Sequence, residues 1–131
     1  MIVPKHYENL DVLHENTMPY RAYYIPASKR MGILAENRED SDRISMLNGD
    51  WKFKYYTSIY DLQEKFYEEG FSVEDYDTIP VPGMWQYFGY DYLEYMDTRY
   101  PIPIDPPYVP QENPCGAYVH EFEYHKDEKA P

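Results

Sequence analysis

The chain has 131 residues, a formal net charge of -12 and a pI near 4.6, so its length fits one domain. Such an acidic chain is not expected to bind nucleic acid or an anionic membrane, because both are held by clustered lysine and arginine. With the single cysteine Cys115 it forms no internal disulfide, and with no leader or long apolar run we expect a cytoplasmic protein.

Residues 1–43 are expected to form an extended arm. Prolines and charges are scattered through them without a sustained period. Tyr20, Tyr23, Tyr24 and Ile25 are candidates for anchoring this arm onto a folded body.

The pattern changes at Ile44, where we place the start of the folded domain. The Asn48-Gly49 pair favours a turn, because it tolerates a positive φ angle. Aromatic residues then alternate with lysines, which predicts a strand with one buried face. The residues of that face are Trp51, Phe53 and Tyr55, and Lys52, Lys54 and Tyr56 alternate with them.

A short helix is predicted after this strand. Ser58 and Asp61 have the spacing of a capping box, and Leu62 and Phe66 lie one turn apart on one face. Gly70 is placed to end the helix.

Two further strands are predicted. Residues 77–82 can be extended but contain two prolines, which favours the edge of a sheet. Near the end of the chain Tyr118, His120, Phe122 and Tyr124 alternate with Val119, Glu121 and Glu123, which predicts a second clear strand.

The segment between these strands, Trp85 to Gly116, combines aromatic residues with prolines. Each proline fixes φ and removes a backbone donor, so neither a helix nor a regular sheet is expected. The aromatic content distinguishes it from a disordered linker. We therefore expect an ordered, extended loop pressed on a folded body. Its prolines are Pro101, Pro103, Pro106, Pro107, Pro110 and Pro114.

The predicted elements form an all-β fold that is not closed. Two clear strands, one weak strand and one short helix are too few for a sandwich, which needs about seven strands. The chain also stops a few residues after its last predicted strand. We expect a fragment that ends inside its own domain.

Four segments, in order and spacing, resemble the amino-terminal region of family 2 glycoside hydrolases, most closely the large bacterial β-galactosidases. They are HENTMPYRAYYIPAS (14–28), LNGDWKFKYY (47–56), IPVPGMWQYFGYD (79–91) and YPIPIDPPYVPQENPCGAYVHEF (100–122). The proline block is the most specific of them. LNGDWKF alone is shared with β-glucuronidase-like and β-mannosidase-like relatives.

The resemblance implies an incomplete jelly-roll β-sandwich over residues 44–131, the family's sugar-binding domain, preceded by the arm of residues 1–43. The parent enzyme would hydrolyse terminal β-D-galactose residues of lactose-like sugars with retention. It implies a homo-oligomeric parent that uses Mg²⁺ and Na⁺. Because the family's two catalytic glutamates lie on a downstream barrel, no catalytic residue is assigned to this chain, which is expected to be inactive alone.

Asp97 is the first candidate for a contact with substrate. In the resembled family an asparagine lies three residues before a Tyr-Pro pair and binds the galactosyl unit; here Asp97 precedes Tyr100-Pro101 by that spacing. Aspartate keeps the acceptors and loses the amide donor. The alternative is an ordinary loop aspartate or a partner of Arg99.

Trp85 is a weaker candidate for a substrate contact. Its ring can stack on a sugar, but a tryptophan beside Gly83 and Gly89 is more often packed under a loop. No metal site is expected. His6, His14, His120 and His125 lack the spacing of metal ligands.

Two other functions remain open. A stand-alone carbohydrate-binding module would hold sugar without cleaving it, but would need enough strands to close a sandwich. A truncated product with only an assembly role is the third alternative.

Overall fold

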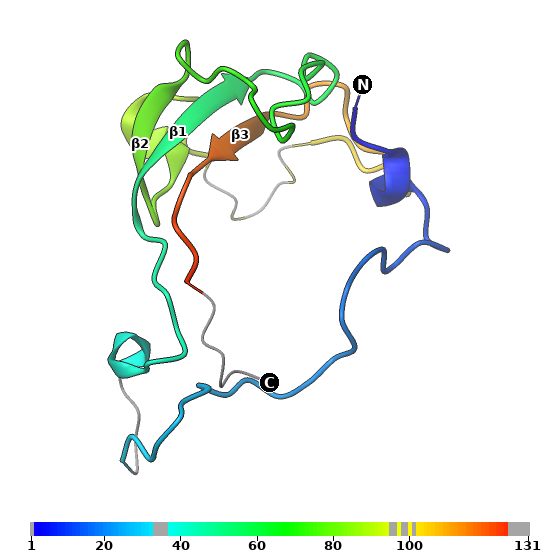
Figure 1. Ribbon diagram of the computed structural model, residues 1–131. Coiled ribbons are helices and arrows are strands. Elements are labelled where there is room, and N and C mark those ends of the chain that lie inside the picture. Colours follow the sequence, from blue (N-terminus) through cyan, green and yellow to red (C-terminus); the bar gives the residue numbers. More distant parts are fainter. Residues whose placement is uncertain (1, 33–36, 95–96, 98–99, 101, 126–131) are drawn as a thin grey trace.

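The computed structural model describes residues 2–32, 37–94, 97, 100 and 102–125. Its centre is a three-stranded antiparallel sheet with the strand order β2-β1-β3 (Figure 1). The strands are β1 (Gly49–Tyr56), β2 (Asp77–Val81) and β3 (Cys115–Val119). Three short 3-10 turns accompany them: η1 (Lys5–Glu8), η2 (Arg38–Asp40) and η3 (Trp85–Phe88).

The all-β class and the edge position of residues 77–81 are confirmed. The register places Phe53 of β1 opposite Asp77 of β2 and Tyr118 of β3. Directly opposite residues share a face of the sheet, so Phe53 and Tyr118 meet on the same side. Phe53 is fully buried.

The opposite face of β1 differs from the prediction. Tyr56, which we grouped with the lysines of the outward face, is buried in a cluster with Leu62, Tyr76 and Ala117. Lys54 lies on the same face, and its Nζ contacts Glu64 at 2.9 Å. The segment between β1 and β2 folds over this face, so both sides of β1 are covered.

The helix predicted over residues 58–70 is wrong. This stretch forms turns, with Asp61 N donating to Ser58 O at 2.9 Å. Leu62 is buried against the sheet, and Glu64 is held by Lys54 and by the Tyr56 hydroxyl. These contacts with β1 stabilise the observed turns more than a helix would be stabilised by its spacing of apolar residues, because a short isolated helix is marginal in water.

Two strand boundaries also differ from the prediction. Asn48-Gly49 forms no turn, and Gly49 with φ of 139° is the first residue of β1. The last strand ends at Val119, before the predicted Phe122 and Tyr124. The side chain of His120 nevertheless stays on the same face as Tyr118, because its ring stacks on Trp51 of β1 with the ring centroids 4.9 Å apart.

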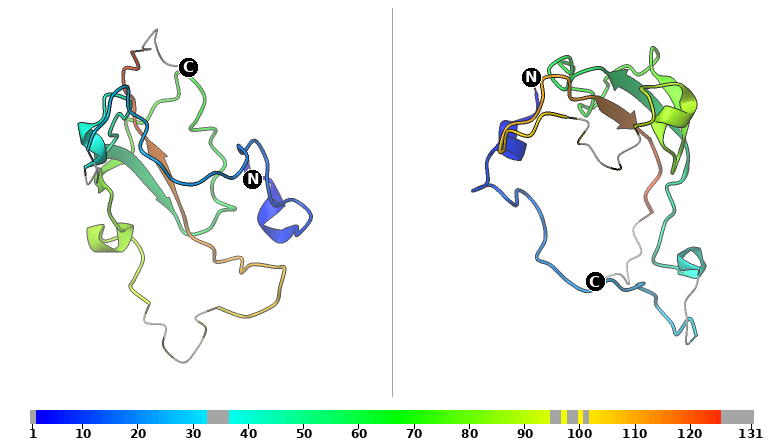
Figure 2. Two further views of the ribbon diagram at one scale, coloured as in Figure 1. Left: turned by 90° about the horizontal axis from the view of Figure 1, so that it is seen from below. Right: turned by 180° about the vertical axis from the view of Figure 1, so that it is seen from behind.

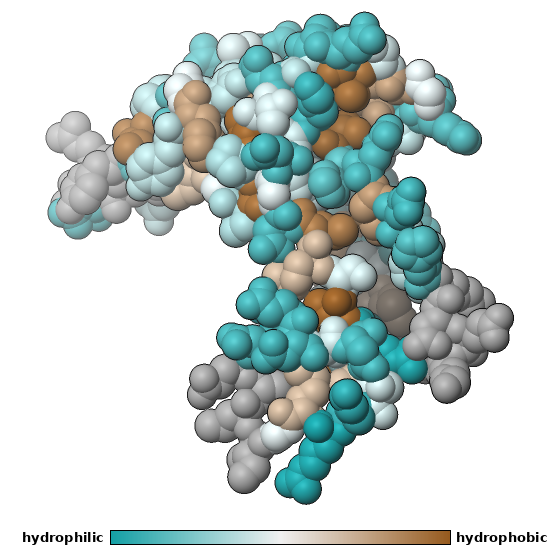
Figure 3. Space-filling model, turned by 60° about the vertical axis from the view of Figure 1, so that its left-hand side comes forward, coloured by the Kyte–Doolittle hydropathy of each residue, from teal (hydrophilic) through white to brown (hydrophobic). Residues whose placement is uncertain are grey.

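Residues 2–32 leave the sheet and return to it through η2 (Figures 1 and 2). Ile2 and Val3 pack against the buried cluster, whereas Tyr20 is 88% exposed. The Ser28 backbone N–H donates to Asp42 at 3.0 Å, and the Ser41 hydroxyl donates to the Pro26 carbonyl. The segment therefore has local ties and little regular structure. Around the sheet, apolar side chains lie in small groups among polar ones (Figure 3).

No helix in the described ranges has the length and apolar character needed to cross a membrane.

Gly116 of β3 leaves room for the aromatic rings on the Phe53 face. A Cβ atom built on Gly116 would lie 3.0 Å from Cζ3 of Trp85 and closer still to the Phe53 ring. The Phe53 ring cannot withdraw easily, because Phe53 is enclosed on all sides. Glycine is required here for close approach and not for an unusual backbone angle.

Gly116→Ala is therefore expected to destabilise the fold by about 1 to 3 kcal/mol, the range for overpacking a tight core. Urea unfolding of the purified chain measures this. A double variant with Phe53→Leu should show favourable coupling, since the smaller side chain relieves the collision. A loss below roughly 0.5 kcal/mol, the range of an ordinary surface substitution, would contradict the account.

A second prediction concerns Glu64, whose pKa is lowered by the Tyr56 hydroxyl and by Lys54. A lowered pKa stabilises the fold above the ordinary value of 4.5, and this contribution is lost as the pH falls through the folded-state pKa. Glu64→Gln should therefore be less stable than the natural chain at neutral pH, with a difference that shrinks below about pH 4.5.

Thermal unfolding from pH 7 to pH 3 tests the Glu64 prediction. Glu68→Gln is the matched control, because Glu68 pairs with Lys65 at the surface and such pairs contribute little. A pH-independent difference for Glu64→Gln would show that its charge does not matter.

Candidate functional site

The loop that carries the predicted site starts from an aromatic cluster on the Phe53 face of the sheet. Phe53 lies at its centre, with ring centroids 4.7 Å from Tyr118, 4.8 Å from Tyr90 and 6.1 Å from Trp85. Tyr55 completes the cluster 5.8 Å from Trp85. Edge-on and tilted pairs of this kind add stability beyond the buried area. The aromatic cluster thus fixes η3 and Tyr90 on the sheet.

A hydrogen bond holds the first end of the loop. The Tyr90 hydroxyl donates to Asp77 Oδ2 of β2 at 2.5 Å. This bond is the main cause that raises the pKa of Tyr90 to about 12, because the phenolate form would lose it and would face the carboxylate. Gly89, with φ of 90°, makes the bend that turns Tyr90 toward β2.

Two hydrogen bonds hold the other end of the loop to the segment after β1. Ile59 N donates to Asn113 O at 2.8 Å, and the Ser58 hydroxyl donates to Gln111 O at 2.6 Å. Within the loop, Tyr108 N donates to Asp105 O at 2.8 Å. We name residues 91–112 the proline loop, and it is fixed at both of its ends.

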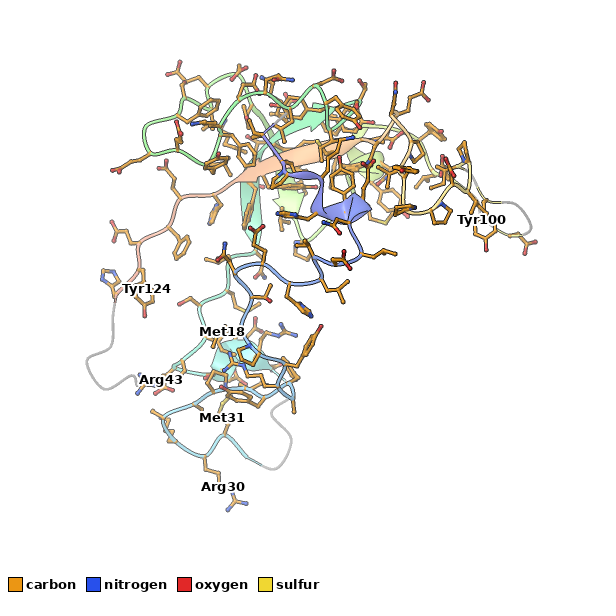
Figure 4. The ribbon with its side chains drawn as sticks, turned by 90° about the vertical axis from the view of Figure 1, so that its right-hand side faces the viewer. Met18, Arg30, Met31, Arg43, Tyr100 and Tyr124 are labelled. Atoms are coloured by element: carbon orange, nitrogen blue, oxygen red, sulfur yellow. The ribbon has the colours of Figure 1, made fainter. Side chains whose placement is uncertain are left out.

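Asp97 lies on the proline loop and is exposed. Tyr100, three residues on, is 74% exposed and lies far out from the sheet in the side-chain view (Figure 4). Arg99, the alternative partner of Asp97, lies outside the described residues. The structure thus leaves Asp97 exposed to solvent.

Trp85, the weaker candidate, is half-buried against Phe53 and Tyr55. Its Nε1 is buried with no hydrogen-bond partner among the described residues. Part of the ring is therefore engaged in packing against β1.

The described residues include no group of three or more His, Cys, Asp and Glu side chains arranged to hold a metal ion. His6 Nε2 contacts Glu15 at 2.7 Å, and His14 shares a 2.8 Å hydrogen bond with Tyr20. Burial raises the pKa of the Cys115 thiol, which disfavours its reactive thiolate form.

Comparison with known families identifies the chain. The family described as "Glycosyl hydrolases family 2, sugar binding domain" matches residues 44–130, a range that contains the whole sheet and the proline loop. The chain belongs to glycosyl hydrolase family 2. The resemblance seen in the sequence is thereby confirmed, and the matched part is described as a sugar-binding domain.

Relatives named β-galactosidase match the arm as well. The protein of Actinobacillus pleuropneumoniae is 41% identical over 118 residues, which cover 90% of this chain and 11% of that protein. The protein of Staphylococcus xylosus is 38% identical over 123 residues, 93% of this chain and 12% of its own length. That of Pectobacterium atrosepticum is 43% identical over 100 residues. The chain thus spans about a tenth of the length of these curated relatives.

Several residues that build the site carry no signal in the sequence. Asp77 reads as the first residue of an edge strand, yet it anchors Tyr90 thirteen positions away. Ser58 reads as a helix cap, yet its hydroxyl binds a carbonyl 53 positions along the chain. The bend at Gly89 is not among the predictions from the sequence, although a glycine between aromatic residues is a signal from which it could have been predicted.

Proposed function

We propose that this chain is the amino-terminal part of a retaining β-galactosidase, in which it serves as scaffold and as one lip of the sugar pocket. The observation that carries the proposal is the identity of 41% over 90% of the chain with a relative named β-galactosidase. The geometry supports it, because a loop fixed at both ends is suited to present a side chain to a neighbouring domain.

In this proposal the Asp97 carboxylate accepts hydrogen bonds from hydroxyl groups of a terminal galactosyl unit. A neutral sugar hydroxyl donates well to a carboxylate, and such charge-assisted bonds are short and strong. The exposed position of Asp97 on the proline loop supports the role. Trp85 acts from below, by packing against Phe53 and Tyr55 and so fixing the start of that loop.

The chemical step takes place elsewhere in the proposed enzyme. Retaining hydrolysis needs two carboxyl groups about 5 to 5.5 Å apart, one acting as nucleophile and one as acid and base. We assign both to a catalytic domain outside this chain. The contribution of Asp97 is to bind and orient the sugar, so its effect on the rate comes through positioning.

Several finer points complete the proposal. The substrates are lactose-like β-galactosides, the enzyme is a cytoplasmic homo-oligomer, and nucleic acid and membranes are not among its partners. We assign the ligands of its Mg²⁺ and Na⁺ ions to other parts of the enzyme. The net charge of -12 is consistent with weak attraction to polyanions.

The purified chain is expected to have no β-galactosidase activity, because the proposal places both catalytic carboxylates outside it. Release of nitrophenol from a nitrophenyl β-galactoside measures this, against a mock purification. Hydrolysis above that background, removed by substitution within this chain, would contradict the proposal.

In the full-length enzyme, Asp97→Ala should lower kcat/KM for a galactoside by roughly tenfold to a hundredfold, because a hydrogen bond to a charged group contributes about 1.5 to 3 kcal/mol. Asp97→Asn should have a small effect, since the amide keeps an acceptor.

Asp105→Ala is the matched control for Asp97, because Asp105 is another exposed aspartate of the proline loop. It should leave kcat/KM unchanged. Equal kcat/KM for Asp97→Ala and the natural enzyme, at normal yield, would reduce Asp97 to an ordinary loop residue.

A further inference from the structure

A hollow lies on the chain at the end of the proline loop that leads into β3. It has a volume of about 500 Å³ and is lined by Ser58, Tyr60, Gln111 and Glu112. The hollow is open to solvent, and its volume lies within the range of about 300 to 1,000 Å³ that small-molecule sites occupy. Its walls come from the turns after β1 and from the chain just before β3, which run side by side in both Figure 1 and Figure 2.

The walls of this hollow are held in place by hydrogen bonds. Ile59 N donates to Asn113 O at 2.8 Å, which fixes the two segments to each other. The Ser58 hydroxyl donates to Gln111 O at 2.6 Å and accepts from Tyr60 N at 3.2 Å. Ser58 is thereby used in building the wall. The groups left to meet a ligand are the ring of Tyr60 and the exposed side chains of Gln111 and Glu112.

The chemistry of these groups selects the kind of ligand. A carboxamide both donates and accepts hydrogen bonds, a carboxylate accepts them, and an aromatic ring offers an apolar face. The carboxylate of Glu112 disfavours an anion. Lys5 Nζ of η1 lies 5.3 Å from the centroid of the Tyr60 ring, and this positive charge disfavours a cationic ligand beside it. A neutral ligand with several hydroxyl groups and one apolar face fits what remains.

We propose that the hollow formed by Ser58, Tyr60, Gln111 and Glu112 is a saccharide subsite that binds a neutral hexose, separate from the contact at Asp97. It deepens the proposed function, and it rests on that function only for the choice of galactosides as ligands. The hexose packs against the Tyr60 ring, and its hydroxyls donate to Glu112 and exchange hydrogen bonds with Gln111.

Saturation-transfer NMR on the purified chain tests the subsite, with methyl β-D-galactopyranoside at millimolar concentration as the probe. We expect transfer to the sugar in the natural chain. Gln111→Ala and Glu112→Gln should each weaken binding by roughly threefold to tenfold, for the loss of one hydrogen bond. Glu121→Gln is the matched control, because Glu121 is an exposed glutamate away from the hollow.

The outcomes separate the two proposals. Transfer that falls in Gln111→Ala and Glu112→Gln but not in Glu121→Gln or Asp97→Ala supports the subsite. Transfer that is lost only in Asp97→Ala overturns the subsite and favours the proposed function. No transfer in the natural chain, or none that depends on Gln111 and Glu112, also overturns it. Circular dichroism of each variant verifies that the exposed substitutions leave the fold intact.

Discussion

The burial of Phe53 between Gly116 and the rings above it is the contact on which the rest of the structure depends. The Phe53 ring contacts Tyr118, its neighbour in β3. It also contacts the rings of Trp85 and Tyr90 in the segment between β2 and the proline loop. One side chain thus ties the sheet to the start of the proline loop. Because its position is filled to contact distance, the loop has little freedom to rotate on the sheet.

The two faces of β1 hold different segments of the chain in place. The face with Phe53 is aromatic and fixes the segment that leads into the proline loop. The face with Tyr56 combines a small buried cluster with a polar clamp, where Lys54 contacts Glu64 and Asp75. That clamp holds the long connection between β1 and β2 without a helix. A strand covered on both faces is the natural centre of such a small sheet.

The sequence predicts the parts of this chain that depend on local pattern. The alternation from Trp51 to Tyr56 identifies β1, and the prolines place residues 77–81 at an edge. It fails where partners lie far apart in the chain. Leu62 and Phe66 have helical spacing, yet contacts of their segment with β1 decide its structure. The anchoring of the proline loop by Asp77 and Ser58 is of the same non-local kind, and the role of Asp97 came from family resemblance alone.

The proline loop, closed by hydrogen bonds at Tyr90 and Asn113, has a consequence for how such a domain evolves. The entropy of closing a loop grows only slowly with its length, so residues added or exchanged at its tip alter the folding equilibrium little. Selection can then vary the side chains near Asp97 and Tyr100 while the sheet stays intact. The residues near Asp97 and those that fix the loop to the sheet lie in different parts of the same segment, and a change in one group need not be compensated in the other.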